Sequence, residues 1–261
     1  FHVSVGTPPR ARTRSGRGIC SGGRGPSALS TGAGAVIPWL HAGDPPDAFP
    51  PVGTALTDPD GLLCAGGDLS PARLLEAYRR GIFPWFSEGQ PILWWSPDPR
   101  TVLYPAEFKV SRSLAKTIRN RGFAVTVDRA FAEVMARCAD ERLRPEGTWI
   151  SPQMRAAYQR LHELGLAHSY ETWDGDRLVG GLYGVALGSV FFGESMFSLE
   201  RDASKVALAE LVRAMIERNG RLIDCQVASA HLESLGARSI PRSQFVRELA
   251  ETVPDVPSGV P

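Results

Sequence analysis

An aspartate and a glutamine two residues apart are the side chains of this sequence best suited to chemistry. Asp224 and Gln226 lie in residues 222–227, which are otherwise apolar. Successive side chains of a strand point to opposite faces, so a strand here would place both polar groups on one face. Burying a carboxylate without a partner costs free energy, which makes this arrangement indicative of a functional site. The structural alternative is a buried Asp224 paired with a nearby arginine.

Apolar periodicity and cap or turn residues predict the elements that would position these two side chains. In chain order they are a helix from Ser70-Pro71 to Gly81, a strand over 123–127, a helix from Ser151-Pro152 to about 165, a strand over 168–173, a turn at Asp174-Gly175, strands over 178–187 and 189–198, a helix over 204–218, the strand over 222–227, and short helices near 229–235 and 242–251. This order predicts an α+β fold with helices packed on a mixed sheet.

The predicted C-terminal part resembles the core of the N-acetyltransferase superfamily. The acetyl-CoA loop of that superfamily is absent, and residues 197–205 stand in its place. We expect residues 44–99 to form a small N-terminal α/β domain and residues 100–252 an N-acetyltransferase-like mixed-sheet catalytic domain. Residues 1–43 are rich in Arg, Gly and Ser and are predicted to be a disordered extension, and residues 253–261 a flexible tail.

Charge and cysteine usage limit the classes of function. The net charge is +1, but five arginines and no acidic residue precede Asp44, so the remainder is net negative. Nucleic-acid binding by the folded part therefore requires a local basic patch. The four cysteines have no paired spacing, so we expect no metal site and no cofactor. No secretory pattern or membrane-length apolar run is present, which predicts a cytoplasmic protein without membrane association, and we expect a monomer.

One basic cluster meets that requirement, because no acidic residue lies between Glu107 and Asp128. Its members are Lys109, Arg112, Lys116, Arg119 and Arg121. On a helix, the spacing i, i+4 and i+7 would place Arg112, Lys116 and Arg119 on one face. Such a run is usually a solvated surface, but here it interrupts a net-negative chain.

Seven segments together resemble the leucyl/phenylalanyl-tRNA–protein transferases of bacteria. They are GGDLSPARLLEAYRRGIFPWF from Gly66, ILWWSPDPR from Ile92, EGTWI from Glu146, LHELGLAHS from Leu161, LVGGLYGV from Leu178, FFGESMFS from Phe191 and LIDCQV from Leu222. The resemblance extends over about residues 47–251. So many separate motifs in one order identify the chain as a member of this family.

The resemblance implies an enzyme that moves Leu or Phe, less often Met, from its tRNA to the N-terminal amine of proteins that begin with Arg or Lys. The product would be marked for N-degron degradation. The aminoacyl ester is already activated, so the reaction needs no ATP, cofactor or metal. An α-amine has a pKa of about 7.7–8.0 and must lose a proton before it attacks. Asp224 would attract that charge, and Gln226 would orient the amine. We expect Asp224→Ala to abolish transfer with folding and tRNA affinity nearly intact.

Glu194 is the third polar candidate that the resemblance implies. Alternation along the predicted strand places Glu194 on one face with Met196. It would position either the aminoacyl adenosine or the basic N-terminus of the acceptor protein. The structural alternative is an ion pair with Arg201 or Lys205.

The resemblance also implies an apolar pocket for the aminoacyl side chain and an aromatic site for the terminal adenosine. The expected pocket residues are Leu182, Phe191, Met196, Leu208, Leu211 and Ile223. Leu182 and Leu211 stand where other members have Met and Phe, so the preference between Leu and Phe stays open. Trp85 and Trp149 would stack on the adenosine, worth about 1–3 kcal/mol, although composition alone favours a core role for both. The basic cluster would contact the tRNA backbone.

Two other functions remain open from the sequence. One is an N-acetyltransferase-like enzyme that uses an acyl-thioester, and the other is a catalytically inactive adaptor that binds tRNA or N-degrons. Transfer of labelled Leu from tRNA without binding of CoA would exclude both.

Overall fold

The structure is a computed structural model that describes residues 28–30, 36–140 and 148–254. The small sheet contains β1 (Ala28–Ser30), β2 (Val36–Leu40), β3 (Leu62–Gly66), β4 (Phe83–Pro84) and β5 (Leu93–Trp95). The large sheet contains β6 (Arg100–Leu103), β7 (Ala124–Val127), β8 (Ala167–Asp174), β9 (Arg177–Leu187), β10 (Val190–Ser198), β11 (Leu222–Gln226) and β12 (Arg238–Ile240). Their orders are β1-β2-β3-β5-β4 and β12-β6-β11-β10-β9-β8-β7.

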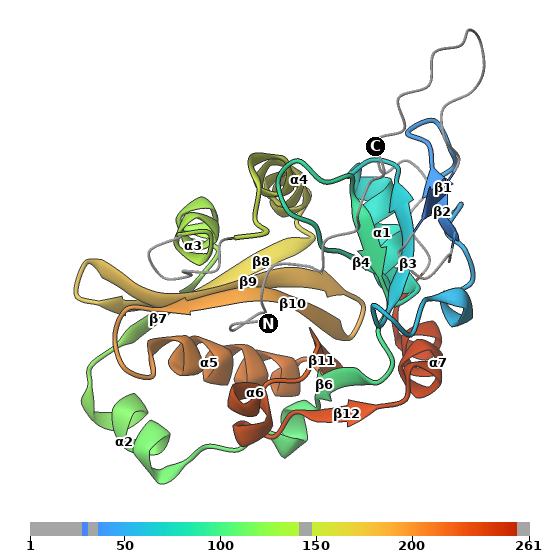
Figure 1. The fold of residues 1–261 in the computed structure, drawn as a ribbon. Helices are drawn as coiled ribbons and strands as arrows, with labels where there is room; N and C mark the ends of the chain where they lie inside the picture. Colours follow the sequence, from blue (N-terminus) through green and yellow to red (C-terminus); the bar gives the residue numbers. More distant parts are fainter. Residues whose placement is uncertain (1–27, 31–35, 141–147, 255–261) are drawn as a thin grey trace, which may run out of the picture.

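The α-helices are α1 (Pro71–Arg79), α2 (Arg112–Asn120), α3 (Phe131–Cys138), α4 (Pro152–Glu163), α5 (Ala203–Glu217), α6 (Ala230–Ser234) and α7 (Arg242–Thr252). Short 3₁₀ helices lie at η1 (Val52–Thr54) and η2 (Pro105–Glu107). Helices α3 and α4 cover one face of the large sheet and α5 the other, while the small sheet and α1 lie beside one end (Figure 1). No helix within the described ranges is long and apolar enough to cross a membrane.

The N-terminal part begins earlier than predicted. Strand β2 pairs in parallel with β3, and Ile37 and Leu40 are buried. The prediction of a disordered extension over residues 1–43 is therefore wrong for residues 36–40, because this apolar run gains burial by adding a strand. It is also wrong for residues 28–30, which form β1. Residues 1–27 and 31–35 lie outside the described part of the chain.

Helix α1 has the predicted ends. The Ser70 hydroxyl accepts a hydrogen bond from the backbone N–H of Arg73 at 3.4 Å, which caps the first turn. Gly81 follows the helix with φ +74°, a conformation that glycine adopts without steric cost.

The large sheet is mixed, as the sequence predicts. Strands β8, β9 and β10 are successive antiparallel neighbours, and α5 crosses to β11, which pairs with β10 in parallel. Strands β6 and β12, which extend the sheet beyond β11, were not predicted from the sequence. At the other end of the chain, Val253 is buried, so the flexible tail predicted from residue 253 begins too early; residues 255–261 lie outside the described part.

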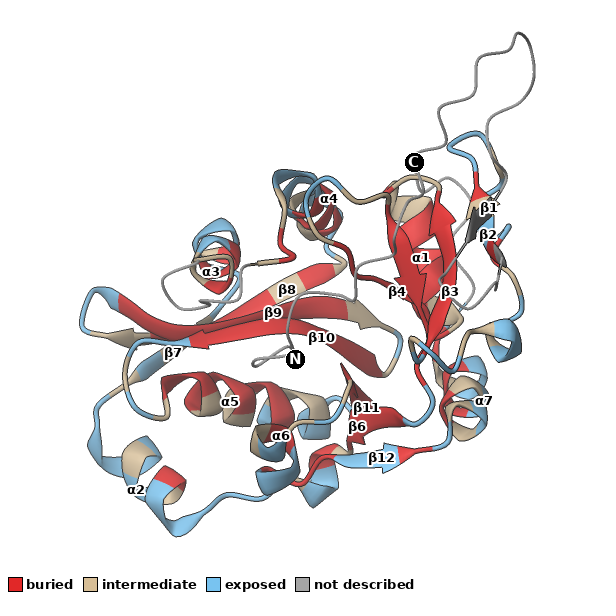
Figure 2. Cartoon of the chain, in the orientation of Figure 1, coloured by how far each residue is buried: buried red, intermediate tan, exposed pale blue. Residues whose placement is uncertain are grey.

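The two faces of the large sheet belong to different apolar clusters. One cluster includes Tyr158 and Tyr183 and continues into the N-terminal part through Tyr78 and Trp94. The other lies between the sheet and α5. Strands β10 and β11 separate the two clusters and are buried almost throughout (Figure 2).

Candidate functional site

Asp224 is fully buried on β11 and is paired with Arg100 of the adjacent strand β6. The Arg100 Nε donates to Oδ1 at 2.8 Å and Nη2 donates to Oδ2 at 2.7 Å. The structural alternative from the sequence, a buried aspartate satisfied by an arginine, is therefore present. Gln226, also buried, follows closely: its backbone N–H donates to Oδ1 of Asp224 at 3.0 Å.

The end of β11 is irregular. Asp224 lies opposite Val102 and Gln226 lies opposite Thr101, so Cys225 is an extra residue in this strand. Gln226 has φ +59°. The regular alternation assumed for residues 222–227 therefore ends at this bulge, and a hydrogen bond, not the pleat, holds Gln226 to Asp224.

Glu194 lies on β10 between two phenols. Tyr78 of α1 donates to Oε1 at 2.6 Å, and Tyr158 of α4 donates to Oε2 at 2.8 Å. The two phenol oxygens also lie in hydrogen-bonding contact, and because each phenol has one proton, all three contacts are hydrogen bonds at once only when Glu194 is itself protonated and donates to one phenol. Burial raises the pKa of Glu194 to about 7, although the hydrogen bonds from both phenols lower it, and the charge of Asp224 raises it further. Burial, followed by the nearby Glu194 charge, raises the pKa of both tyrosines well above 10.

Two expectations for Glu194 are wrong. The register shift between Gly193 and Ser195 makes Glu194 a bulge residue, so it joins the tyrosines while Met196 packs in the cluster against α5. Arg201 and Lys205 both pair with Asp202 instead, at 3.8 and 2.9 Å.

Tyr78 and Tyr158 were not singled out as site residues. Both occupy apolar positions of amphipathic helices, and that pattern indicates only a core role. Their hydroxyls gain a partner only when α1 and α4 meet β10.

The expected pocket residues come together in one buried cluster. Leu182 lies on β9, Phe191 and Met196 on β10, Leu208 and Leu211 on α5, and Ile223 on β11. These side chains pack against one another as buried core residues, and the strands β10 and β11 that carry three of them also carry the polar candidates.

Trp85 and Trp149 are buried in the cluster that contains Tyr78 and Tyr158. The Trp85 ring lies 5.4 Å from that of Trp95, and Trp95 Nε1 donates to the Trp85 carbonyl at 2.7 Å. Both tryptophans therefore pack as core residues in this structure, and a contact with adenosine stays a prediction.

The basic cluster includes helix α2, which was not among the elements predicted from the sequence. Arg112, Lys116 and Arg119 are exposed, and within the described residues none of them has an ion-pair partner at 4.0 Å or less. Lys109 precedes the helix and is also exposed. Arg121 differs, because it pairs with Glu200 at 3.2 Å.

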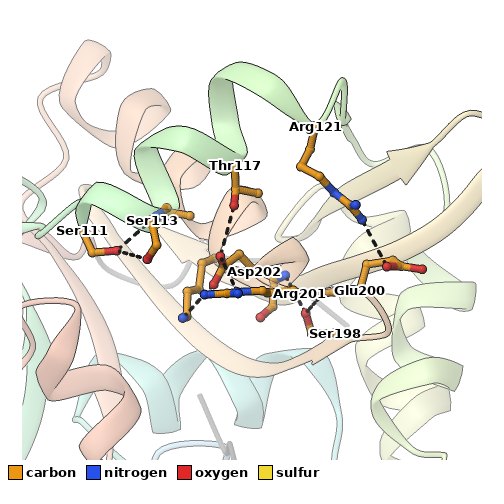
Figure 3. A network of polar contacts seen from close by, with 11 residues as sticks. Ser111, Ser113, Thr117, Arg121, Ser198, Glu200, Arg201 and Asp202 are labelled. Carbon is orange, nitrogen blue, oxygen red and sulfur yellow. Dashed lines mark hydrogen bonds and ion pairs between the residues drawn. The ribbon is translucent and has the colours of Figure 1, made fainter.

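The opposite side of α2 is anchored to the segment before α5, as Figure 3 shows. The Thr117 hydroxyl donates to Asp202 at 3.2 Å, and Arg121 reaches Glu200. Leu114 is the buried residue of the helix. This anchoring leaves the three outward cations available to a polyanion.

Metal chemistry was not expected from the sequence. Over the ranges that the structure describes, no group of three or more His, Cys, Asp or Glu residues is placed to hold a metal ion.

The large sheet combines the antiparallel strands β8, β9 and β10 with β11, which follows the crossover helix α5 and pairs with β10 in parallel. Carboxylates lie on these strands beside an apolar cluster. This arrangement places the protein among acyltransferase-like α+β enzymes. The leucyl/phenylalanyl-tRNA protein transferase family matches residues 102–250, and the N-terminal domain of the same family matches residues 67–98. The chain belongs to the leucyl/phenylalanyl-tRNA–protein transferase family. It is an aminoacyltransferase, and its reaction moves leucyl or phenylalanyl groups from tRNA to protein.

Two relatives illustrate the similarity. The leucyl/phenylalanyl-tRNA–protein transferase of Aromatoleum aromaticum is 61% identical over 215 residues, which are 82% of this chain and 90% of that protein. That of Chromohalobacter salexigens is 61% identical over 218 residues, 84% of each chain. Among solved structures, a GCN5-related N-acetyltransferase-like protein from Streptococcus suis is 15% identical with a TM-score of 0.35, covering 66% of this chain and 65% of that one.

Proposed function

We propose that this enzyme transfers Leu or Phe, less often Met, from aminoacyl-tRNA to the N-terminal α-amine of proteins that begin with Arg or Lys. The observation that carries the proposal is the position of Glu194, Asp224 and Gln226 on the paired strands β10 and β11, where burial and the charge of Asp224 both raise the pKa of Glu194. Phe192, two residues before Glu194, lies opposite Asp224, and Gln226 follows the bulge. The apolar cluster of Leu182, Phe191, Met196, Leu208, Leu211 and Ile223 adjoins them.

Because the aminoacyl ester is already activated, the enzyme has mainly to position the amine and the ester carbonyl for reaction. The amine nitrogen attacks the ester carbonyl, a C–N bond forms, the C–O bond to the ribose breaks, and the tRNA hydroxyl leaves with a proton. Holding the amine and the ester in attack geometry supplies much of the rate of such a reaction. In our proposal Gln226 and Glu194 contact the reacting groups, and Asp224 holds Gln226 in place by accepting its backbone N–H.

The apolar cluster would hold the aminoacyl side chain. Hydrophobic pockets distinguish one methylene by only about 1–3 kcal/mol, so acceptance of Leu, Phe and some Met is the expected specificity. Trp85 and Trp149 would contact the terminal adenosine, and the cations of α2 would contact tRNA phosphates. A protein that gains Leu or Phe at its N-terminus would then enter N-degron degradation.

The test is incubation with labelled Leu-tRNA or Phe-tRNA and a peptide that begins with Arg. A matched peptide that begins with acetyl-Arg lacks the amine, and one that begins with Glu lacks the basic side chain. We expect label only on the Arg peptide. Equal labelling of the Glu peptide would reject the acceptor specificity, and labelling of the acetylated peptide would reject the N-terminal amine as the acceptor.

A further inference from the structure

Arg100, which was not a site residue predicted from the sequence, contacts several elements around the proposed site. Besides its two hydrogen bonds to Asp224, its Nη1 donates to the carbonyl of Gly81 at 3.0 Å. The rings of Phe83 and Phe245 lie 4.8 and 4.7 Å from the guanidinium carbon. The side chain is fully buried. Arg100 therefore ties β11 both to the end of α1 and to α7.

Asp224 in turn supports an unusual backbone conformation at Gln226. Its Oδ1 accepts the Gln226 N–H, and Gln226 has φ +59°. The other non-glycine residues with positive φ in the described part are Asp128, Asp202 and Asn219. Asp and Asn tolerate this region because their short side chains bond the local backbone. Gln226 lacks a side chain of that length, so the carboxylate two residues earlier provides the stabilising bond.

We propose that Arg100 is a positioning residue, which holds the side chain of Asp224 in place and, through its hydrogen bond to the backbone, sets the turn that presents Gln226 to the incoming amine. The inference rests on the proposed function and deepens it. Both carboxylate oxygens of Asp224 are occupied by the guanidinium, and a proton there would displace one of these two hydrogen bonds. Asp224 is then not the proton acceptor. The ammonium loses its first proton to solvent, and the second amine proton goes to the departing tRNA oxygen.

The first experiment compares Arg100→Lys with Arg242→Lys in single-turnover transfer of labelled Leu to an Arg peptide. Arg242 is a matched control, because it also joins α7 to the segment between β5 and β6 through the Ser96 carbonyl and Asp98, but it does not touch Asp224. We expect Arg100→Lys to slow transfer at least tenfold with less than a threefold change in the tRNA dissociation constant. Arg242→Lys is expected to stay within threefold of the wild-type rate. Equal rates in the two variants would overturn the proposal.

The pH profile separates positioning from proton transfer. A profile set by the acceptor amine rises at a pH of about 7.7–8.0. We expect the same rise in wild type and Arg100→Lys, at different heights. Glu194 has a pKa of about 7 and also titrates in this region, so the limb to compare is the one at about 7.7–8.0. A shift of that limb when Arg100 is replaced would overturn the proposal.

A second measurement does not depend on activity. Amide hydrogen exchange at Gln226 reports the hydrogen bond to Asp224 directly. We expect Arg100→Lys to reduce protection at Gln226 at least tenfold, with no such change in Arg242→Lys. If the wild-type enzyme fails to transfer Leu, the proposed function fails, yet unchanged protection in Arg100→Lys would still overturn the positioning role.

The double variant Arg100→Gln/Asp224→Asn serves if Arg100→Lys does not fold. It removes both charges but keeps an oxygen acceptor for the Gln226 N–H. We expect it to transfer at least tenfold faster than Asp224→Ala, which lacks that acceptor. A folded double variant no faster than Asp224→Ala would show that the Asp224 charge itself is required, and would overturn the proposal.

Discussion

The phenol of Tyr78 donates a hydrogen bond of 2.6 Å to Glu194, a residue 116 positions later in the chain. Tyr78 lies on α1 in the N-terminal part, whereas Glu194 lies in the middle of β10. A second phenol, Tyr158, occupies the other carboxylate oxygen. The position and charge of Glu194 therefore depend on how the N-terminal part and α4 pack against the large sheet.

The pH dependence of stability follows from the raised pKa of Glu194. In the unfolded chain this carboxyl ionises near 4.5, whereas in the folded protein it keeps its proton to about 7. The folded state thus binds more protons between these values, so stability falls as the pH rises through this range. We expect wild type to lose about 3 kcal/mol relative to Glu194→Gln between pH 4.5 and 7. Urea unfolding at several pH values in this range measures the free energy of unfolding of both proteins. If the two free energies change equally with pH, the raised pKa of Glu194 is contradicted.

The phenols should stabilise the ionised form of Glu194. Tyr78→Phe and Tyr158→Phe each remove a donor, so we expect each to cost about 1–3 kcal/mol at pH 8 and less at pH 5, where Glu194 is protonated. Tyr170→Phe is the control, because within the described residues the Tyr170 hydroxyl has no hydrogen-bond partner. The same loss at both pH values would show that packing, not the carboxylate, determines the effect.

Asp224→Ala should destabilise the fold, contrary to the expectation from the sequence that folding stays nearly intact. The change leaves the fully buried Arg100 without its partner, which typically costs about 3–5 kcal/mol. Urea unfolding measures the loss. Replacing both residues, as Arg100→Met/Asp224→Leu, should recover most of it, because an apolar pair leaves no buried charge. A double variant as unstable as the single one would contradict this account.

The outward face of α2 should determine the salt dependence of tRNA binding. Arg112, Lys116 and Arg119 changed together to Ala should weaken binding and reduce the slope of log K against log salt by about 2–3, given about 0.7–0.9 per phosphate contact. Filter binding at several salt concentrations provides the slope.

A matched control removes three arginines that are already paired within their helices. Arg137, Arg160 and Arg213 contact Glu133, Glu163 and Glu210 respectively. Their joint change to Ala lowers the net charge equally but should leave the slope nearly unchanged. Equal slopes in both triple variants would assign the effect to net charge and remove α2 from the proposed interface.

Enlarging the apolar cluster should alter the choice between Leu and Phe. Leu211→Ala opens space beside Phe191 and Met196, so the Phe:Leu transfer ratio should rise, within the roughly 10–200-fold range available to hydrophobic discrimination. The cavity also costs about 2–5 kcal/mol of stability. Leu222→Ala makes a similar cavity on the other face of the sheet and should leave the ratio unchanged. Competition between labelled Leu-tRNA and Phe-tRNA measures the Phe:Leu transfer ratio. An equal change of this ratio in both variants would contradict the pocket assignment.

Much of the fold was predictable because its signals are local. The Ser70 cap, the turn at Asp174-Gly175 and the apolar stripe of α5 each depend on residues a few positions apart. Strands β6 and β12 escaped prediction, since three or four residues carry too little periodicity to distinguish a strand from a loop. Residues 36–40 were missed because their apolar run lies within a polar, glycine-rich stretch.

The sequence by itself determined which side chains are chemically capable, the order of strands β8 to β11 and helix α5 around them, and, through its motifs, the family. Only the tertiary structure decided their partners: Arg100 for Asp224, and Tyr78 and Tyr158 for Glu194. It also decided the two bulges that change which way Glu194 points and how Gln226 is held. The physical reason is that a buried charge takes whichever donor the packed chain brings within hydrogen-bonding distance. Such donors lie far away in sequence and have no local pattern.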